Sequence, residues 1–199
     1  FKNTWIIFTA DHGEMLGDHH MSQKNLFFEG SAHVPLLIMP PQGRSLPQNI
    51  SVEAPTDLVD LYPTILAMAG LSSPVSVSGR NLLEPVPMDR IFFGNSLNRN
   101  FCVMEEKLKL VYSAVGDHVL LFDLNTDPME QHNLAEDPAW QERKAKLWKL
   151  LLEHTAQYTP EALDENGQFL TYEAPHFPGD VPGRWFGFHY HDYSVDTFH

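Results

Sequence analysis

The chain has 199 residues, with 13 Lys and Arg against 26 Asp and Glu, and a formal net charge of -13 at pH 7. A nucleic-acid-binding surface needs clustered Lys and Arg, which this sequence lacks, so its charge disfavours that class of partner. No apolar run reaches the roughly 18 to 20 residues of a membrane helix. The single cysteine, Cys102, excludes a disulfide within the chain, and we interpret it as a small buried residue on a strand. The cellular compartment stays open.

The first predicted element is a short buried strand that ends in ionisable residues. Residues 6–9 (IIFT) are apolar and rich in β-branched side chains, which is typical of a central parallel strand, and Asp11 and His12 follow. Open α/β sheets bind ligands at the carboxyl ends of their strands, where these two side chains would lie. Gly13 permits a backbone bend that would let both point at one cation. The alternative is a solvated turn in which Asp11 caps a helix.

Two further elements are predicted before the pattern changes. Residues 25–31 favour a short helix or turn, and the apolar run VPLLIM at 34–39 favours a second strand. A helix is predicted to begin at Thr56, as its cap, and to end before Gly70. Pro63 should bend or divide that helix, because proline lacks the backbone N–H that a helix interior needs.

Beyond residue 88 the sequence favours short strands instead of an α/β pattern. Residues 71–88 are rich in Ser, Pro and Gly and predict a connector. Strands are predicted at 91–93, 101–105, 108–113 and 119–123, with a hairpin turn at Gly116 and Asp117 and an amphipathic helix over 140–158. The predicted division is 1–88, the end of an α/β domain; 89–158, an antiparallel sheet with one covering helix; and 159–199, a tail rich in aromatic residues, Pro and His.

Two stretches together resemble the sulfatase family of the alkaline-phosphatase superfamily. The first is ADHGEMLGDHH, followed by Lys24 and FFEGSAHVPLLIMPP, and the second is LLFDLNTDPMEQHNLAEDP at residues 120–138. Two signatures in this order are far more specific than DHG alone. The resemblance implies an α/β, alkaline-phosphatase-like sulfatase fold, of which this chain carries the C-terminal half: the end of the catalytic domain plus a small α+β subdomain.

The resemblance implies a metal-dependent hydrolase of sulfate monoesters, that is, a sulfuric ester hydrolase. The family's nucleophile is a formylglycine made from the first residue of Cys/Ser-x-Pro/Ala-x-Arg, and the context of Cys102, FCVM, lacks the Pro and Arg of that motif. The N-terminal half of the same enzyme would therefore supply the nucleophile. Two alternatives stay open: a phosphonate monoester or phosphodiester hydrolase of the same superfamily, and a non-catalytic fragment that acts as a structural or binding module.

Three residues match family positions with a direct role in catalysis. Asp11 and His12 match metal ligands, and the implied metal is calcium, with manganese or zinc as alternatives because one ligand is an imidazole. Lys24 matches the lysine that contacts sulfate or phosphate oxygens, where an ammonium stabilises developing negative charge. The alternative is that Lys24 is an ordinary exposed lysine.

Three further residues are candidates for substrate binding: His19, His33 and Arg99. His19 lies in a loop crowded with ionisable residues, where one histidine could simply be packed. His33 precedes VP, and we interpret it first as a buried, hydrogen-bonded residue. Arg99 belongs to the run NSLNRN, which could bind a sugar hydroxyl or carboxylate, although Asn-rich runs are more often turns.

The remaining expectations concern partners and the tail. The resemblance implies a sulfated small molecule or sulfated carbohydrate as substrate. The many large rings in residues 183–199 predict that this tail packs on the body or on a second subunit, which would make a homo-oligomer. Asp123, Asp127 and Glu130 are interpreted as markers of a tight turn.

Overall fold

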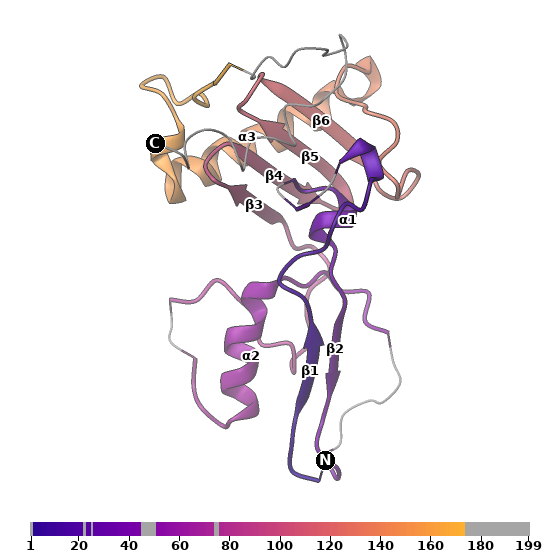
Figure 1. Ribbon diagram of the computed structural model, residues 1–199. Helices are drawn as coiled ribbons and strands as arrows, with labels where there is room; N and C mark the ends of the chain where they lie inside the picture. The colour runs from indigo at the N-terminus through magenta and orange to yellow at the C-terminus, as the bar shows by residue number, and fades with distance from the viewer. Residues whose placement is uncertain (1, 22, 25, 45–50, 74–75, 174–199) are drawn as a thin grey trace, which may run out of the picture. The chain divides into compact units, whose positions relative to one another are not determined.

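The computed structural model describes residues 2–21, 23–24, 26–44, 51–73 and 76–173 (Figure 1). The predictions for the tail at 183–199 lie outside these residues. The chain forms two compact units, one of Phe1–Asp11 and Val34–Arg90 and one of His12–His33 and Ile91–His199. None of the helices in the described part of the chain has both the length and the apolar character that a membrane crossing requires.

The first unit contains a two-stranded antiparallel ribbon. In it β1 (Ile6–Thr9) pairs with β2 (Leu36–Met39), with Ile6 opposite Met39 and Phe8 opposite Leu37. Residues 6–9 were predicted to form a central parallel strand, but the pairing of β1 with β2 is antiparallel, because an apolar run indicates burial and not the direction of the neighbouring strand. One face of the ribbon is left open: Phe8 is 62% exposed and Leu37 58%.

The helix of the first unit begins one residue later than predicted. The short 3₁₀ turn Leu58–Asp60 leads into α2 (Leu61–Met68), and Asp57, not Thr56, forms a capping box with Asp60. Thr56 lies one residue too early for this role, since a cap must bond the backbone N–H groups of the first turn. The prediction that Pro63 bends or divides the helix is wrong: α2 continues through Pro63, which lies in the first turn, where its missing N–H costs little.

Asp60 holds the helix of the first unit against residues 79–90. Its buried carboxylate accepts hydrogen bonds from the backbone N–H groups of Asp57 (2.8 Å) and Arg80 (2.7 Å) and from the Arg90 guanidinium (2.5 Å). Burial alone would raise the pKa of Asp60, but these donors outweigh it and hold the pKa below its ordinary value of 3.8. The carboxylate is thus ionised, and each of its oxygens has a hydrogen-bond donor.

The second unit is built on a four-stranded antiparallel sheet, as predicted. The strands are β3 (Phe92–Ser96), β4 (Asn100–Glu105), β5 (Leu108–Ser113) and β6 (His118–Asp123), hydrogen-bonded in that order. The long helix α3 (Gln141–Tyr158) follows a 3₁₀ turn, Pro138–Trp140, whose cap Asp137 accepts a bond from the Ala139 N–H at 2.9 Å.

Successive residues of this sheet face two different layers. On one face, Phe101, Leu110 and Tyr112 pack with Leu147 and Leu151 of α3. The opposite face carries Cys102, Val111, Leu120 and Phe122, which pack with Met15, Met21, Leu26 and Phe28. Figure 1 shows α3 behind the sheet and the indigo segment with α1 (Glu29–Ala32) in front of it. The sheet therefore separates a helix layer from a loop layer.

Cys102 lies in this buried layer, which confirms its interpretation as a small core residue. Its side chain is 6% exposed, and burial raises the pKa of its thiol to about 12. A thiol in this state is a poor nucleophile.

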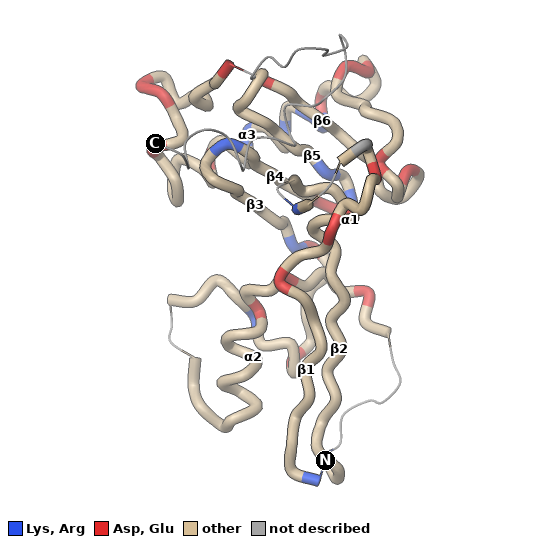
Figure 2. The backbone as a smooth tube through the Cα atoms, in the orientation of Figure 1, with Lys and Arg blue, Asp and Glu red and all other residues tan. Residues whose placement is uncertain are grey.

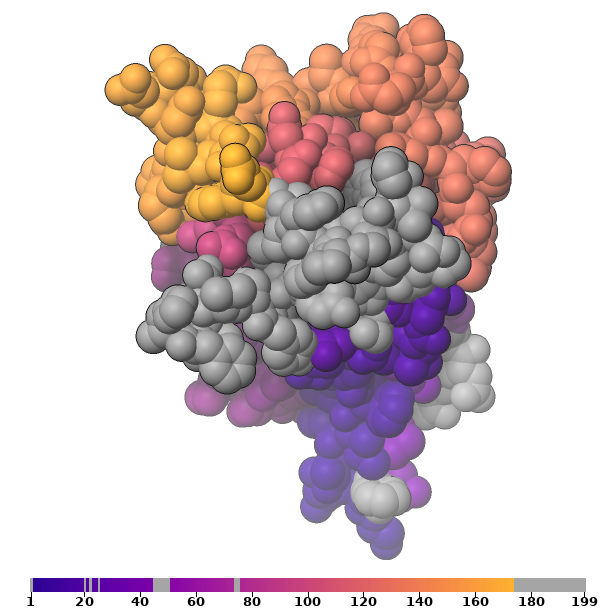
Figure 3. All heavy atoms as spheres, turned by 45° about the horizontal axis from the view of Figure 1, so that its top comes forward, coloured from indigo at the N-terminus to yellow at the C-terminus, as the bar shows by residue number. Residues whose placement is uncertain are grey.

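The last described residues fold back onto the second unit. A 3₁₀ turn, Pro160–Ala162, precedes an antiparallel bridge between Leu163 and Phe169, and Val115 pairs with Tyr172. In the space-filling view, the yellow atoms of these last described residues lie beside the pink atoms of the sheet (Figure 3). Over the described residues, Lys and Arg positions do not gather into a stripe (Figure 2).

Candidate functional site

The segment from His12 to His33, which we call the site loop, forms the loop layer of the second unit. Its apolar residues Met15, Met21, Leu26 and Phe28 are each no more than 5% exposed. Its polar residues His12 and Lys24 are half-buried and exposed, respectively. The alternation of buried apolar anchors with outward polar residues fixes the loop on the sheet and leaves its ionisable groups accessible.

His12 and Lys24 meet although twelve residues separate them in sequence. The Nδ1 atom of His12 lies 2.7 Å from the carbonyl oxygen of Gly13, and its Nε2 atom lies 2.5 Å from the Lys24 ammonium nitrogen. A carbonyl oxygen only accepts, so this network assigns the imidazole proton to Nδ1 and leaves Nε2 as the acceptor. The lone pair on Nε2 of His12 is thus directed at the Lys24 ammonium group.

Close backbone contacts with α1 shape the loop around these two residues. Gly13 donates to the carbonyl of Ser31 at 2.7 Å, Glu14 donates to that of Gly30 at 2.9 Å, and the Ser31 hydroxyl donates to the carbonyl of Lys24 at 2.6 Å. A Cβ at position 13 would lie 2.1 Å from the Gly30 carbonyl oxygen. Glycine is needed at position 13 for this close approach, whereas the sequence suggested a backbone bend.

Asp11 ends the first segment of the first unit, two residues after β1, and its side chain is exposed. It therefore follows the strand end as predicted. Glu14 accepts hydrogen bonds from the backbone N–H groups of Leu16 at 3.4 Å and of Gln23, so its carboxylate caps the turn that follows it.

The three candidate substrate residues lie in different surroundings. The His19 ring stacks on Phe28 with centroids 4.2 Å apart, so it is a packed histidine. The His33 side chain is 76% exposed and its Nδ1 lies 2.8 Å from Glu29. The prediction that His33 is buried is wrong, because it follows the end of α1 at the surface, but the hydrogen bond is present.

Arg99 lies in the turn between β3 and β4, in the second unit. Leu97 and Asn98 adopt positive φ angles of 57° and 54°, and the Asn95 amide donates to the Asn98 side chain at 2.7 Å, so the run forms a hairpin turn. The Arg99 guanidinium lies 4.9 Å from the ring centroid of Tyr172. The turn interpretation of this run is therefore confirmed.

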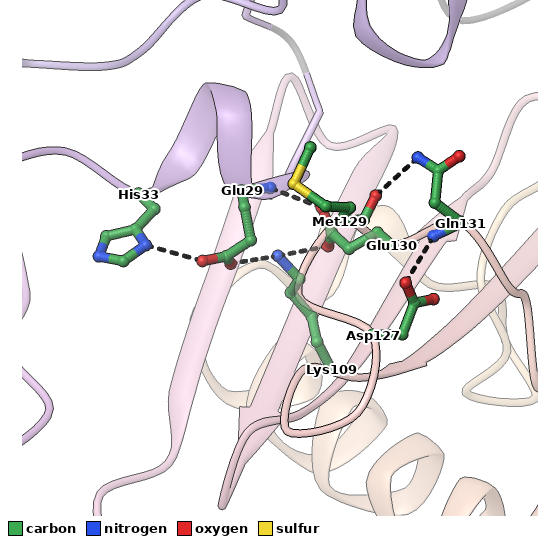
Figure 4. Close-up of polar contacts among 7 residues, drawn as sticks. All are labelled: Glu29, His33, Lys109, Asp127, Met129, Glu130 and Gln131. Atoms are coloured by element: carbon green, nitrogen blue, oxygen red, sulfur yellow. Dashed lines mark hydrogen bonds and ion pairs between the residues drawn. The ribbon is translucent and has the colours of Figure 1, made fainter.

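A buried ionic cluster lies between the site loop and the sheet. Lys109 on β5 is 3% exposed and its ammonium lies 2.6 Å from a carboxylate oxygen of Glu29 and 2.6 Å from one of Glu130 (Figure 4). Glu130 also accepts the backbone N–H of Glu29 at 2.7 Å. Glu130 is thus more than the turn marker that the sequence suggested.

The cluster perturbs the titration of all three groups. Burial alone would raise the pKa of Glu29, but Lys109 and His33 hold it below its ordinary 4.5, whereas burial prevails at Glu130 and raises its pKa above 4.5. Burial would lower the pKa of Lys109, but the two carboxylates raise it above 10.5. The lysine therefore keeps its charge in a buried place.

Glu29 and Lys109 were missed from the sequence. The available signal was Lys109 itself, a cation between Leu108 and Leu110 in a predicted strand, on the same face as Val111. A lysine on a buried face requires a carboxylate partner, so the sequence could have predicted that Lys109 has one. The identity of the carboxylate that pairs with Lys109 depends on how the site loop packs on the sheet. The periodicity of the sequence does not predict this packing.

No cluster of three or more His, Cys, Asp and Glu side chains that could hold a metal ion occurs among the described residues. Asp11 and His12 thus form at most part of a coordination shell.

The comparisons with known proteins point to one family. A model of the sulfatase family matches residues 1–71. The chain is 32% identical over 165 residues to the uncharacterized sulfatase YidJ of Escherichia coli strain K12, covering 77% of this chain and 32% of that protein. It is 36% identical over 174 residues to the choline-sulfatase of Rhizobium meliloti strain 1021, covering 81% of this chain and 33% of the relative. The chain therefore spans about a third of the length of these curated relatives.

Solved structures agree on the fold. The phosphonate monoester hydrolase of Agrobacterium radiobacter superposes with a TM-score of 0.61 at 32% identity, covering 82% of this chain and 38% of that one. A protein solved in complex with its substrate D-glucosamine-2-N,6-O-disulfate superposes with a TM-score of 0.61 at 24% identity, covering 80% of this chain and 35% of that one. The fold is the alkaline-phosphatase-like fold of these enzymes. On its two sequence signatures, its fold and its relatives, this chain belongs to the sulfatase family.

Proposed function

We propose that this chain forms part of a sulfuric ester hydrolase that cleaves sulfate monoesters, with Asp11 and His12 as metal ligands and Lys24 as the group that contacts the substrate's oxygens. The single observation that carries the proposal is the contact between the Lys24 ammonium and His12 Nε2 at 2.5 Å. It supports one polar site in which a basic nitrogen and a cation lie together on an otherwise apolar-anchored loop. An acidic protein of this net charge needs such a locally positive group to bind an anionic ester.

The chemistry of the donor set fits a divalent cation. The Gly13 carbonyl fixes the His12 proton on Nδ1, so Nε2, which contacts the Lys24 ammonium in the structure, is the nitrogen that would bind the cation. With the cation on Nε2, the Lys24 ammonium would bond the sulfate oxygens instead of His12. A carboxylate from Asp11 supplies a hard oxygen ligand. We propose calcium, with manganese or zinc as alternatives because of the imidazole. When bound, the cation would neutralise charge on the sulfate group.

The chain's own residues have separate roles in this proposal. Asp11 and His12 hold the cation, and Lys24 donates to sulfate oxygens, where its charge favours the more negative transition state. The formylglycine nucleophile is proposed to come from the N-terminal half of the same enzyme. Sulfated small molecules or carbohydrates are the proposed substrates, and the sulfated glucosamine bound to the solved relative supports this class. His19, His33 and Arg99 stay proposals for substrate contact.

The open face of the β1–β2 ribbon supports the proposed partner. Phe8 is 62%, Leu37 58% and Met39 45% exposed, and all three share one face of the ribbon. Apolar side chains grouped in this way mark an interaction surface. The proposed occupant is the N-terminal half of the enzyme, since the relatives are about three times as long as the stretch this chain matches.

A phosphonate monoester or phosphodiester hydrolase is the second candidate, which the 32% identity to the Agrobacterium enzyme favours. The two are separated by assaying the complete enzyme with 4-nitrophenyl sulfate and with 4-nitrophenyl phenylphosphonate. We expect kcat/KM to be higher for the sulfate. A higher kcat/KM for the phosphonate would replace the first proposal with the second, and no turnover of either ester would favour a structural or binding module.

A further inference from the structure

The ionic cluster of Glu29, Lys109 and Glu130 joins the site loop, to which Glu29 belongs, to β5 and to the segment that follows β6, and the proposed function gives it no role. We propose that these three residues position the site loop, so that the backbone on either side of His12 and Lys24 is held in one place on the sheet. The catalytic consequence of this inference rests on the proposed function, whereas the tether itself does not.

The first step is that α1 cannot define its own place. It has four residues, Glu29–Ala32, and an isolated helix of this length is unstable in water. Both of its polar ties to the sheet side originate at Glu29: the carboxylate bonds Lys109 at 2.6 Å, and the backbone N–H bonds Glu130 at 2.7 Å. Glu29 therefore fixes where α1 begins.

The second step leads from α1 to the residues of the proposed site. The carbonyls of Gly30 and Ser31 accept the N–H groups of Glu14 and Gly13, and the Ser31 hydroxyl donates to the carbonyl of Lys24. The backbone on either side of the His12–Lys24 contact is thus bonded to α1. A shift of α1 along the sheet would shift both sides of that contact.

The third step is that the ion pairs to Lys109 fix the position of the site loop on the sheet, which the apolar contacts alone do not. The apolar anchors of the site loop pack against Cys102, Val111 and Phe122, and such contacts are non-directional. Lys109 lies on β5, an inner strand of the sheet, and is 3% exposed, so its ammonium is a fixed point. Two carboxylates from separate segments converge on it (Figure 4). The ion pairs specify one register of loop on sheet.

The test uses the complete enzyme with Glu29→Gln and Lys109→Met. Glu29→Gln keeps the size of the side chain and an oxygen acceptor but removes the charge. It is therefore the variant to measure if Lys109→Met does not fold. The matched control is Lys146→Met, which removes an exposed lysine of α3 that pairs with Glu105. Hydrogen exchange is measured for the amides of Gly13 and Glu14 against those of Val103 and Leu121 in the sheet, together with kcat and KM for 4-nitrophenyl sulfate.

In Glu29→Gln we expect the amides of Gly13 and Glu14 to exchange at least about tenfold faster than in the wild type, relative to the sheet amides. The reason is that opening of the loop no longer has to break an ion pair with Lys109. We expect kcat to fall about tenfold or more with a smaller change in KM, as for displaced catalytic groups. Lys146→Met should change neither. If hydrogen exchange became faster by the same factor for the loop and the sheet amides, and kcat did not change, the cluster would stabilise the whole unit without positioning the loop. That result would overturn the proposal. Faster loop exchange in an enzyme whose wild type hydrolyses no sulfate ester would support the tether and contradict the proposed function.

Discussion

The pair of His12 and Lys24 is the most informative contact at the scale of single residues. The Gly13 carbonyl lies 2.7 Å from Nδ1 of His12, and the Lys24 ammonium nitrogen lies 2.5 Å from Nε2, the nitrogen proposed to bind the cation. The Gly13 contact orients the ring, and the Lys24 contact places the ammonium beside the proposed cation site. A ring oriented in this way does not have to turn in order to bind a cation.

Lys24→Ala in the complete enzyme should lower kcat for 4-nitrophenyl sulfate by about 10²-fold or more and change KM much less, because the ammonium acts mainly on charge that develops in the transition state. Lys24→Arg should restore only part of the loss, since the guanidinium is planar and larger. The control is Lys149→Ala, which removes an exposed lysine of α3. A Lys24→Ala enzyme with wild-type kcat would mean that Lys24 is an ordinary surface lysine.

Asp60 should make the first unit sensitive to acid. Its folded pKa lies below 3.8, so its contribution to stability is fully present above that pH and is lost as the pH falls through the folded value. Asp60→Asn should lower the free energy of unfolding at pH 7 by about 3 kcal/mol or more, because Arg90 loses its buried partner. Urea unfolding at a series of pH values checks this. The difference in the free energy of unfolding between wild type and variant should become smaller below about pH 4. A difference that does not change with pH would contradict the conclusion that the Asp60 carboxylate is ionised.

At the scale of elements, the approach of the site loop to α1 depends on one glycine. Gly13→Ala would bring a methyl group to 2.1 Å from the Gly30 carbonyl oxygen, so the loop must move. We expect a loss of about 1 to 3 kcal/mol in stability, as for other overpacked sites, together with lower turnover. Gly30→Ala is the matched control in the same contact, since its Cβ would meet the Met15 sulfur at an ordinary 3.5 Å. Thermal melting of both variants measures the difference, and equal melting temperatures would refute the close-packing argument.

Periodicity predicted the elements of the second unit well, but it did not predict which segments distant in sequence come into contact. The strand Leu108–Ser113 was predicted with the bounds that the structure has, and the helix over 140–158 corresponds to α3, because alternation and 3.6-residue spacing are local properties. The antiparallel partner of β1 was not predicted, since it depends on contacts distant in sequence. The Glu29–Lys109 pair was missed for the same reason, because 80 residues separate its members.

At the scale of the whole molecule, the candidate site was recognisable from motif resemblance more than from residue chemistry. Asp11, His12 and Lys24 were selected because their order and flanking residues match the sulfatase family, and the structure then brought His12 and Lys24 together. The substrate could not be predicted, because specificity resides in surrounding loops and this chain spans about a third of its relatives' length.

The central claim is that this chain supplies the metal-binding pair of a sulfate ester hydrolase. The most direct test is the calcium content of the purified complete enzyme, wild type against Asp11→Ala, with turnover of 4-nitrophenyl sulfate recorded on the same samples. We predict stoichiometric metal and turnover in the wild type, and loss of metal and of nearly all turnover in the variant while its circular dichroism spectrum is unchanged. A folded Asp11→Ala enzyme that retains stoichiometric metal and near-normal turnover would contradict the account.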